Sequence, residues 1–127
     1  MRILISQKVQ EYLRSNNYSS VCMTRGKDRR ISIFPEEEWK RQEHKMELMF
    51  TDTRERKTMS ELFMQNYTKL NLESNGYSTI DIPDELKKWA GIVRDLVIVA
   101  RRNRIEIWSK NNYDLFCRDS SGVVLEG

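Results

Sequence analysis

The feature that most constrains the fold is a repeated pair of strand-like segments. Arg30–Phe34 and Arg104–Trp108 share one order of residue types: arginine, isoleucine, a polar residue, isoleucine and an aromatic residue. Alternation with a period of two is typical of a half-buried strand. Each segment follows another apolar run, Val21–Thr24 in the first case and Leu96–Val99 in the second. The sequence therefore predicts two similar strand pairs, with the isoleucines of both facing one core.

The residues upstream of each strand pair repeat as well. Ile3–Ile5 and Ile80–Ile82 are short apolar runs, 77 residues apart (80 − 3), and the last strands are 74 residues apart (105 − 31). Each run precedes apolar residues at positions i, i+3 and i+4, which predicts one face of a short helix. These residues are Val9, Tyr12 and Leu13 in the first copy and Leu86, Trp89 and Ala90 in the second. Chance similarity is the alternative, but order, type and spacing all favour a repeat of strand, helix, strand, strand.

A hairpin and two further helices are expected outside these patterns. The dipeptide Asn75–Gly76 favours a tight turn, and it lies between the alternating runs Lys69–Leu72 and Ile80–Ile82, which predicts a hairpin. Two helices are expected between the copies, because apolar residues recur there at helical spacing. The first face consists of Trp39, Met46, Met49 and Phe50, and the second of Met59, Leu62, Phe63 and Tyr67.

These elements divide the chain into four parts. The first repeat is expected over residues 1–38, the connecting helices over 39–67 and the second repeat over 68–111. The remainder, 112–127, is expected to be a tail, polar and loose after Phe116.

Composition excludes several classes of protein. The 22 basic and 19 acidic residues give a formal net charge of +3, which permits contact with phosphates without requiring it. Two cysteines, Cys22 and Cys117, and the single His44 are too few for a disulfide framework or a zinc cluster. No apolar run approaches the roughly 20 residues that span a bilayer, and no signal peptide is visible, so we expect a reduced, cytoplasmic protein. Phosphate loops, nucleophile elbows and metal motifs are absent from the sequence. We therefore expect no catalytic residue, no metal, no cofactor and no small-molecule ligand.

The repeated segments also carry a family resemblance. Its residues are Val21–Gly26, Ile33–Pro35 and Glu38–Trp39 in the first copy, and Ile82–Pro83, Ala90–Gly91, Leu96–Val99 and Asn103–Trp108 in the second. With these segments in this order, the chain resembles the MraZ family from about Arg2 to Tyr113, and Asn103–Trp108 is the most specific part. The resemblance implies a bacterial transcriptional regulator built from two AbrB-like repeats, which forms a ring oligomer and represses the division and cell-wall gene cluster.

The resemblance further implies a DNA-contact motif, Asp-x-x-x-Arg, on the hairpin before each Ile-Pro, where the carboxylate holds the arginine. This sequence departs from the motif in both copies. In the second copy, an ungapped count puts Asn75 at the acidic position and Thr79 at the arginine position, whereas a shift of two residues puts Glu73 and Tyr77 there. Asn75, Tyr77 and Thr79 can bond phosphates without charge.

In the first copy, Arg2 stands at the arginine position. Its acidic partner would precede Met1, so the first hairpin is expected to be incomplete and Ile3–Ile5 to lack a hairpin partner.

The two basic loops are the other candidates for contact with nucleic acid. They contain Lys27, Arg29 and Arg30 in the first copy and Arg101, Arg102 and Arg104 in the second. Summed over the chains of an oligomer, such loops would create a strong positive field. A solvated loop surface is the alternative, and the sequence leaves both open. Trp89 and Trp108 fall on apolar faces, so we expect them to pack in the core rather than to stack on bases.

Together these observations predict an α+β fold in which two tandem AbrB-like repeats of the swapped-hairpin type form one unit, with two connecting helices. The expected function is that of a MraZ-like repressor that binds direct repeats in promoter DNA as a homo-oligomeric ring, in the cytoplasm at the nucleoid and without contact with a membrane. The alternative is a degenerate paralogue that keeps the fold and the assembly but no longer binds DNA. Fold analogy alone does not decide between them.

Overall fold

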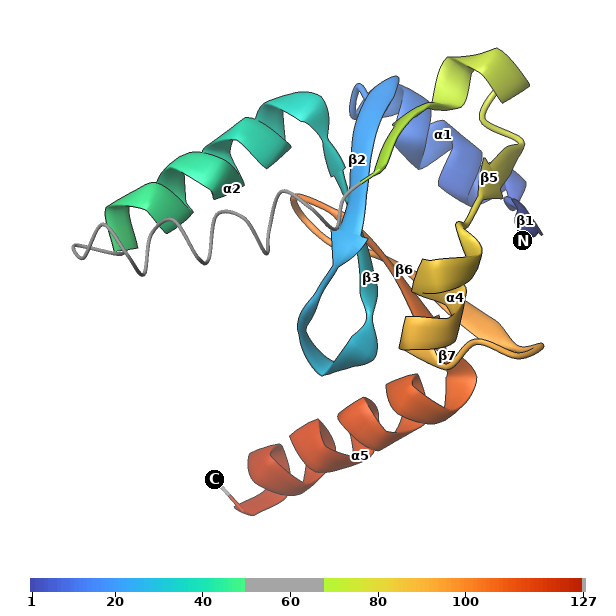
Figure 1. The fold of residues 1–127 in the computed structure, drawn as a ribbon. Coiled ribbons are helices and arrows are strands. Elements are labelled where there is room, and N and C mark those ends of the chain that lie inside the picture. The colour runs from blue at the N-terminus through green and yellow to red at the C-terminus, as the bar shows by residue number, and fades with distance from the viewer. Residues whose placement is uncertain (50–67, 127) are drawn as a thin grey trace.

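The computed structural model describes residues 1–49 and 68–126, and these form two sheets with helices on both sides (Figure 1). A five-stranded sheet has the strand order β4-β2-β3-β7-β6, and a two-stranded ribbon pairs β1 with β5. All of the paired strands are antiparallel. The elements are β1 (Arg2–Leu4), α1 (Gln7–Ser15), β2 (Ser20–Arg25), the 3₁₀ turn η1 (Lys27–Arg29), β3 (Ile31–Pro35), α2 (Glu36–Met49), β4 (Thr68–Asn71), the 3₁₀ turn η2 (Leu72–Asn75), β5 (Thr79–Asp81), α4 (Asp84–Ala90), β6 (Leu96–Ala100), β7 (Ile105–Ser109) and α5 (Lys110–Glu126).

The short helices begin and end where local chemistry favours it. The Ser6 side chain accepts a hydrogen bond from the Val9 N–H and so caps α1, satisfying a donor that the helix leaves free. Helix α4 follows Pro83 and ends at Gly91, which has a φ of 72°. A residue without a Cβ adopts this left-handed conformation at little cost, so Gly91 terminates the helix.

The two copies of the repeat are related by an approximate two-fold axis. Equivalent residues lie opposite each other in two places, Ile3 opposite Ile80 in the β1–β5 ribbon and Ser32 opposite Glu106 in the β3–β7 ladder. Under this symmetry β1, α1, β2 and β3 correspond to β5, α4, β6 and β7. The copies therefore interlock, and the α+β fold class predicted from the sequence is confirmed.

The expected hairpin at Asn75–Gly76 does not form. The chain turns there, with Gly76 at a φ of 63°, but β4 pairs with β2 and β5 pairs with β1. The reason is that Leu72 leaves the sheet and is buried in the core, so that η2 separates the two expected arms. Strand β1 does not pair in a hairpin of its own copy among the described residues; its partner is β5 of the second copy.

The main core lies between the ribbon and one face of the five-stranded sheet. The four isoleucines of the repeated segments are fully buried there, as predicted: Ile31, Ile33, Ile105 and Ile107. They pack with apolar residues of both copies, including Ile3, Leu13, Ile80 and Leu86. The core thus joins the two repeats into one folded unit.

The second face of the sheet is buried too, although the alternating pattern indicated half-buried strands. Ser32 and Glu106 are 3% and 1% exposed. Two helices cover this face, because Trp39 of α2 packs against Phe34 and Trp108 packs against aromatic residues of α5. An alternating strand pattern carries no information about helices that cover its polar face.

The chain after β7 differs from the expected loose tail. Helix α5 extends over Lys110–Glu126, and Tyr113 and Phe116, three residues apart, both contact the Trp108 ring, with centroids 5.9 and 5.0 Å away. This contact holds the start of α5 on the sheet. The first connecting helix is α2, whereas Phe50 and the second helix lie outside the described residues, as do the side chains of Met46 and Met49. No described helix is long and apolar enough to cross a membrane.

Candidate nucleic-acid interface

The β1–β5 ribbon presents an arginine held by a carboxylate. Ile3 and Ile80 face the core, so the alternate side chains, those of Arg2 and Asp81 among them, lie on the outward face. Arg2 and Asp81 stand directly opposite each other, and the Arg2 Nε donates to the Asp81 Oδ1 at 3.0 Å. Both side chains are more than half exposed, at 68% and 52%. Within the described part of the chain, this bond engages Nε and leaves the two terminal NH2 groups of Arg2 toward solvent.

A second arginine lies beside the turn that precedes β5. The Arg14 guanidinium is 5.4 Å from the centroid of the Tyr77 ring, and its Nη2 donates to the Gly76 carbonyl at 3.0 Å. Asn75 is exposed next to this contact and Thr79 is partly exposed in β5. The sequence analysis missed Arg14, because it belongs to helix α1 of the first copy and reaches the second copy only through the fold.

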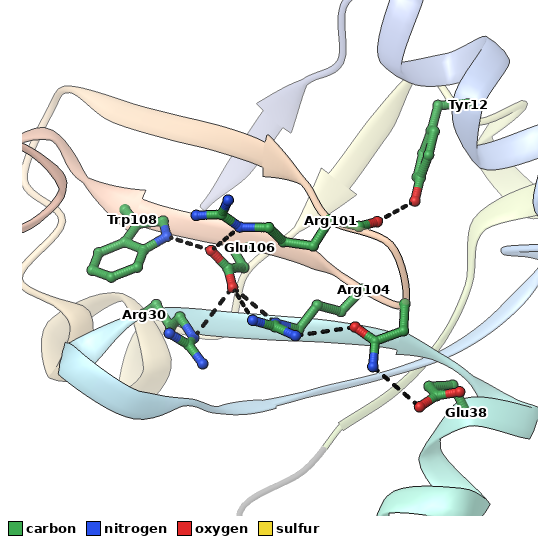
Figure 2. A network of polar contacts seen from close by, with 8 residues as sticks. Tyr12, Arg30, Glu38, Arg101, Arg104, Glu106 and Trp108 are labelled. Atoms are coloured by element: carbon green, nitrogen blue, oxygen red, sulfur yellow. Dashed lines mark hydrogen bonds and ion pairs between the residues drawn. The ribbon is translucent and has the colours of Figure 1, made fainter. Parts of the chain in front are cut away.

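The two basic loops converge on one buried carboxylate, Glu106, in a group named here the Glu106 cluster (Figure 2). Its cations are Arg101, whose Nε lies 3.2 Å from Oε1, Arg104, whose Nε and Nη2 both lie 2.8 Å from Oε2, and Arg30, whose Nε lies 3.4 Å from Oε2. The Trp108 Nε1 donates to Oε1 at 3.1 Å. Burial by itself would raise the pKa of Glu106, but hydrogen bonds from Trp108, Arg101 and Arg104 and the charge of Arg30 lower it below its ordinary value.

This arrangement divides the candidate basic residues into two groups. Arg30, Arg101 and Arg104 surround the single negative charge of Glu106 and direct donors toward it, so they stabilise the sheet and are less available to a ligand. The exposed basic residues of the loops are Lys27, Arg29 and Arg102.

Each basic loop is anchored on a helix of the other copy. Arg29 donates to the Trp89 carbonyl of α4 at 3.2 Å and lies over the Trp89 ring, as does Arg25. Trp89 is half-buried and packs against the main core, as expected, and its ring also lies beneath these two cations. The basic loop of the second copy is held in the corresponding way by the first copy, because the Tyr12 hydroxyl of α1 donates to the Arg101 carbonyl (Figure 2). These contacts fix the positions of both loops.

The fold does not bring all candidate residues onto one surface. The ribbon with Arg2, and the turn with Asn75 and Tyr77, adjoin the isoleucine face of the main sheet, whereas Glu106 and its arginines lie on the opposite face. A straight duplex that contacts the ribbon therefore cannot also rest on the Glu106 cluster of the same chain. No group of three His, Cys, Asp or Glu side chains that could hold a metal occurs in the described ranges.

Comparisons with known proteins agree with the resemblance noted in the sequence. The family model described as "MraZ protein" matches residues 1–60. The chain is 29% identical over 113 residues to proteins named "Transcriptional regulator MraZ" from Natranaerobius thermophilus and Clostridium tetani, with 89% of this chain and 75% of each relative covered. The protein of the same name from Halothermothrix orenii is 29% identical over 112 residues, with 88% and 74% covered. The resemblance predicted from the sequence is therefore confirmed.

Proposed function

We propose that this chain, a relative of the MraZ transcriptional regulators, is a DNA-binding transcriptional regulator of the MraZ type rather than an enzyme. In this proposal its two copies are AbrB-like repeats, and it binds direct repeats in a promoter as a homo-oligomeric ring. It represses the division and cell-wall gene cluster, works in the cytoplasm at the nucleoid, and needs no cofactor.

The observation that carries this proposal is the ion pair between Arg2 and Asp81 on the outward face of the ribbon. A two-stranded ribbon can enter the major groove, where arginine donates two parallel hydrogen bonds to guanine. Because Asp81 engages only Nε, it orients the guanidinium and leaves both terminal NH2 groups for such a bidentate contact. In this chain the carboxylate that holds Arg2 belongs to Asp81 of the second copy, across the ribbon, whereas the sequence analysis places the acidic residue of the motif upstream of Arg2.

Arg14 supports the proposal, because it supplies charge where the second copy lacks its arginine. Its guanidinium adjoins Tyr77 and Gly76, close to the exposed Asn75. Arg14 can thus contact a phosphate beside the uncharged side chains of this turn. The exposed Lys27, Arg29 and Arg102 add to the positive field without contacting the same stretch of duplex.

The small number of exposed cations on the described ribbon, turn and basic loops explains why an oligomer is part of the proposal. One chain neutralises only a few phosphates, and each phosphate contact contributes a modest, salt-dependent part of the affinity. Several linked chains on tandem repeats act at a high effective concentration, so their combined affinity far exceeds that of one chain.

The Glu106 cluster favours a second candidate function, the paralogue that keeps the fold without binding DNA. Three of the basic residues expected at the interface are held by a buried carboxylate and stabilise the sheet. In that case the chain is an interaction protein, and its ribbon has no DNA partner.

A gel-shift assay on duplex DNA with tandem repeats tests the proposal at low and at physiological salt. Arg2→Ala is the main variant, and the matched control is Arg118→Ala, which removes one exposed arginine from α5. A bidentate base contact contributes about 1–3 kcal/mol, so Arg2→Ala should weaken binding by about tenfold or more and the control should change it little. Asp81→Asn should have an intermediate effect, since the arginine stays but loses its charged support.

Two outcomes would contradict the proposal. Equal affinities of Arg2→Ala and Arg118→Ala would exclude the ribbon as the contact surface. The absence of any shift at low salt would favour the paralogue that does not bind DNA.

A further inference from the structure

The outer edge of β6 is an open apolar sheet edge. Strand β6 is the last strand of the five-stranded sheet, and none of the described residues pairs with it on its outer side. Its residues from Leu96 to Val99 are apolar and partly exposed, and the preceding Val93 is 86% exposed. Edge strands normally carry a proline, a lysine or a bulge that prevents pairing with another chain. Strand β6 contains no proline and no charged residue.

The hydrogen bonds to β7 show which backbone groups of β6 point outward. The Lys110 N–H donates to the Asp95 carbonyl, and the Arg101 N–H donates to the Arg104 carbonyl, so Asp95 and Arg101 both direct backbone groups toward β7. Residues of an antiparallel strand alternate in this respect. The N–H and C=O groups of Leu96, Ile98 and Ala100 therefore point to the open side.

The symmetric edge of the same sheet already binds a strand. Strand β2 corresponds to β6, and β4 pairs with it, placing Leu70 opposite Val21 and Thr68 opposite Met23. Val21 and Met23 occupy the positions in β2 that Leu96 and Ile98 occupy in β6. The fold therefore accepts an added antiparallel strand at this place, and β6 is the copy without one.

From this geometry we infer that β6 is a self-association site, at which β6 of a second copy of this chain adds antiparallel, with Ile98 opposite Ile98 of the second copy. This register places Leu96 opposite Ala100 of the second copy, so that each residue with outward backbone groups meets another. In a register with Val97 opposite Val97 of the second copy, Ala100 has no partner within β6. With Val99 opposite Val99, Leu96 has none.

Side-chain chemistry agrees with this register. On one face Val97 lies opposite Val99 of the second copy, so apolar side chains meet across the seam. At each end Asp95 lies opposite Arg101 of the second copy, and Asp95 has no ion pair within the described part of its own chain. Arg101 binds Glu106 through its Nε, so its terminal NH2 groups are the ones that meet Asp95, and this contact adds to the apolar seam at both ends.

The inference is independent of DNA binding. Pairing at β6 joins chains two at a time across a two-fold axis, with the same residues on both sides. It creates one continuous sheet from two chains. A ring built from such pairs needs a second contact elsewhere on the chain.

Sedimentation velocity over a concentration series tests the association with Ala100→Pro. Ala100 is exposed, and the N–H that proline removes points outward, so the ladder to β7 keeps its hydrogen bonds. We expect dissociation constants at least tenfold higher than for the unchanged chain. Leu4→Ser is the matched control, because it removes an apolar side chain that is 82% exposed in β1 and should leave association unchanged.

Disulfide trapping tests the register, in a background carrying Cys117→Ser. Ile98→Cys should give a linked dimer on mild oxidation, because directly opposite residues have Cα atoms about 5.5 Å apart, which suits a disulfide. Val99→Cys should not link, since its counterpart is displaced along the strand. Three results would overturn the inference: a monomer throughout the series, association unaffected by Ala100→Pro in a folded variant, or equal linking at positions 98 and 99.

Discussion

Replacing Glu106 by glutamine measures what the convergence of three arginines contributes to stability. Glutamine has nearly the same size, and its oxygen can still accept from Trp108, so the change removes charge and little else. Removing one partner of a buried ion pair costs about 3–5 kcal/mol. Glu106 is 1% exposed, but the arginine side chains are 16%, 26% and 39% exposed, so water screens part of their mutual repulsion. We therefore expect a loss of about 3 kcal/mol, at the lower end of that range.

Urea denaturation followed by tryptophan fluorescence gives the free energy of unfolding. Glu38→Gln is the control, because Glu38 is also a buried glutamate but its arginine partner, Arg41, is 68% exposed. The control should cost about 1 kcal/mol or less. In the Glu106→Gln background, Arg104→Gln should recover part of the loss, because it removes a cation that has lost its partner. A cost for Glu106→Gln no larger than that of Glu38→Gln would refute the reasoning.

Three further predictions follow from local features. The folded-state pKa of Glu106 lies below its ordinary value of 4.5, so its stabilisation is present above that pH and is lost as the pH falls through the folded-state pKa; unfolding at a series of acidic pH values should show the loss, and Glu106→Gln should flatten it. Gly91→Ala should lower the free energy of unfolding by about 1–2 kcal/mol, because a Cβ there has room but the φ of 72° disfavours it; a thermal melt unchanged from that of the natural chain would contradict this. Trp89→Leu should cost about 1 kcal/mol, because it removes the ring beneath Arg25 and Arg29, and urea melts of Trp89→Phe should show a smaller loss.

The sequence predicts the repeat and the buried isoleucines because both depend on local periodicity. Ile31 and Ile105 fall at equivalent places in matching runs, and any sheet that buries one face must bury them. The partners of the strands depend instead on which edges meet in space. Asn75–Gly76 does turn the chain, but a turn signal contains no information about the burial of Leu72, which separates the arms of the expected hairpin.

In the candidate site, too, the sequence indicates single residues, whereas their partners are set by the fold. Arg2 is a candidate from the sequence because it stands at the arginine position of the family motif, whereas Asp81 is its partner only through pairing between the copies. In the sequence, Glu106 has the pattern of a polar residue in a half-buried strand. The arginines that bind it, such as Arg30 and Arg101, belong to two loops far apart in the sequence. Interactions between distant segments carry no periodic signal, so they become visible only in the fold.

The interlocked pairing of the two copies has a consequence for the order in which the chain can fold. Strand β1 is synthesised well before its partner β5, and β3 likewise waits for β7. Contacts this distant in sequence slow folding, because a large loop must close before they form. During synthesis the apolar Ile3, Ile31 and Ile33 therefore remain without their final neighbours until the second copy appears. A ribosome stalled before β7 would carry a nascent chain that cannot complete its core.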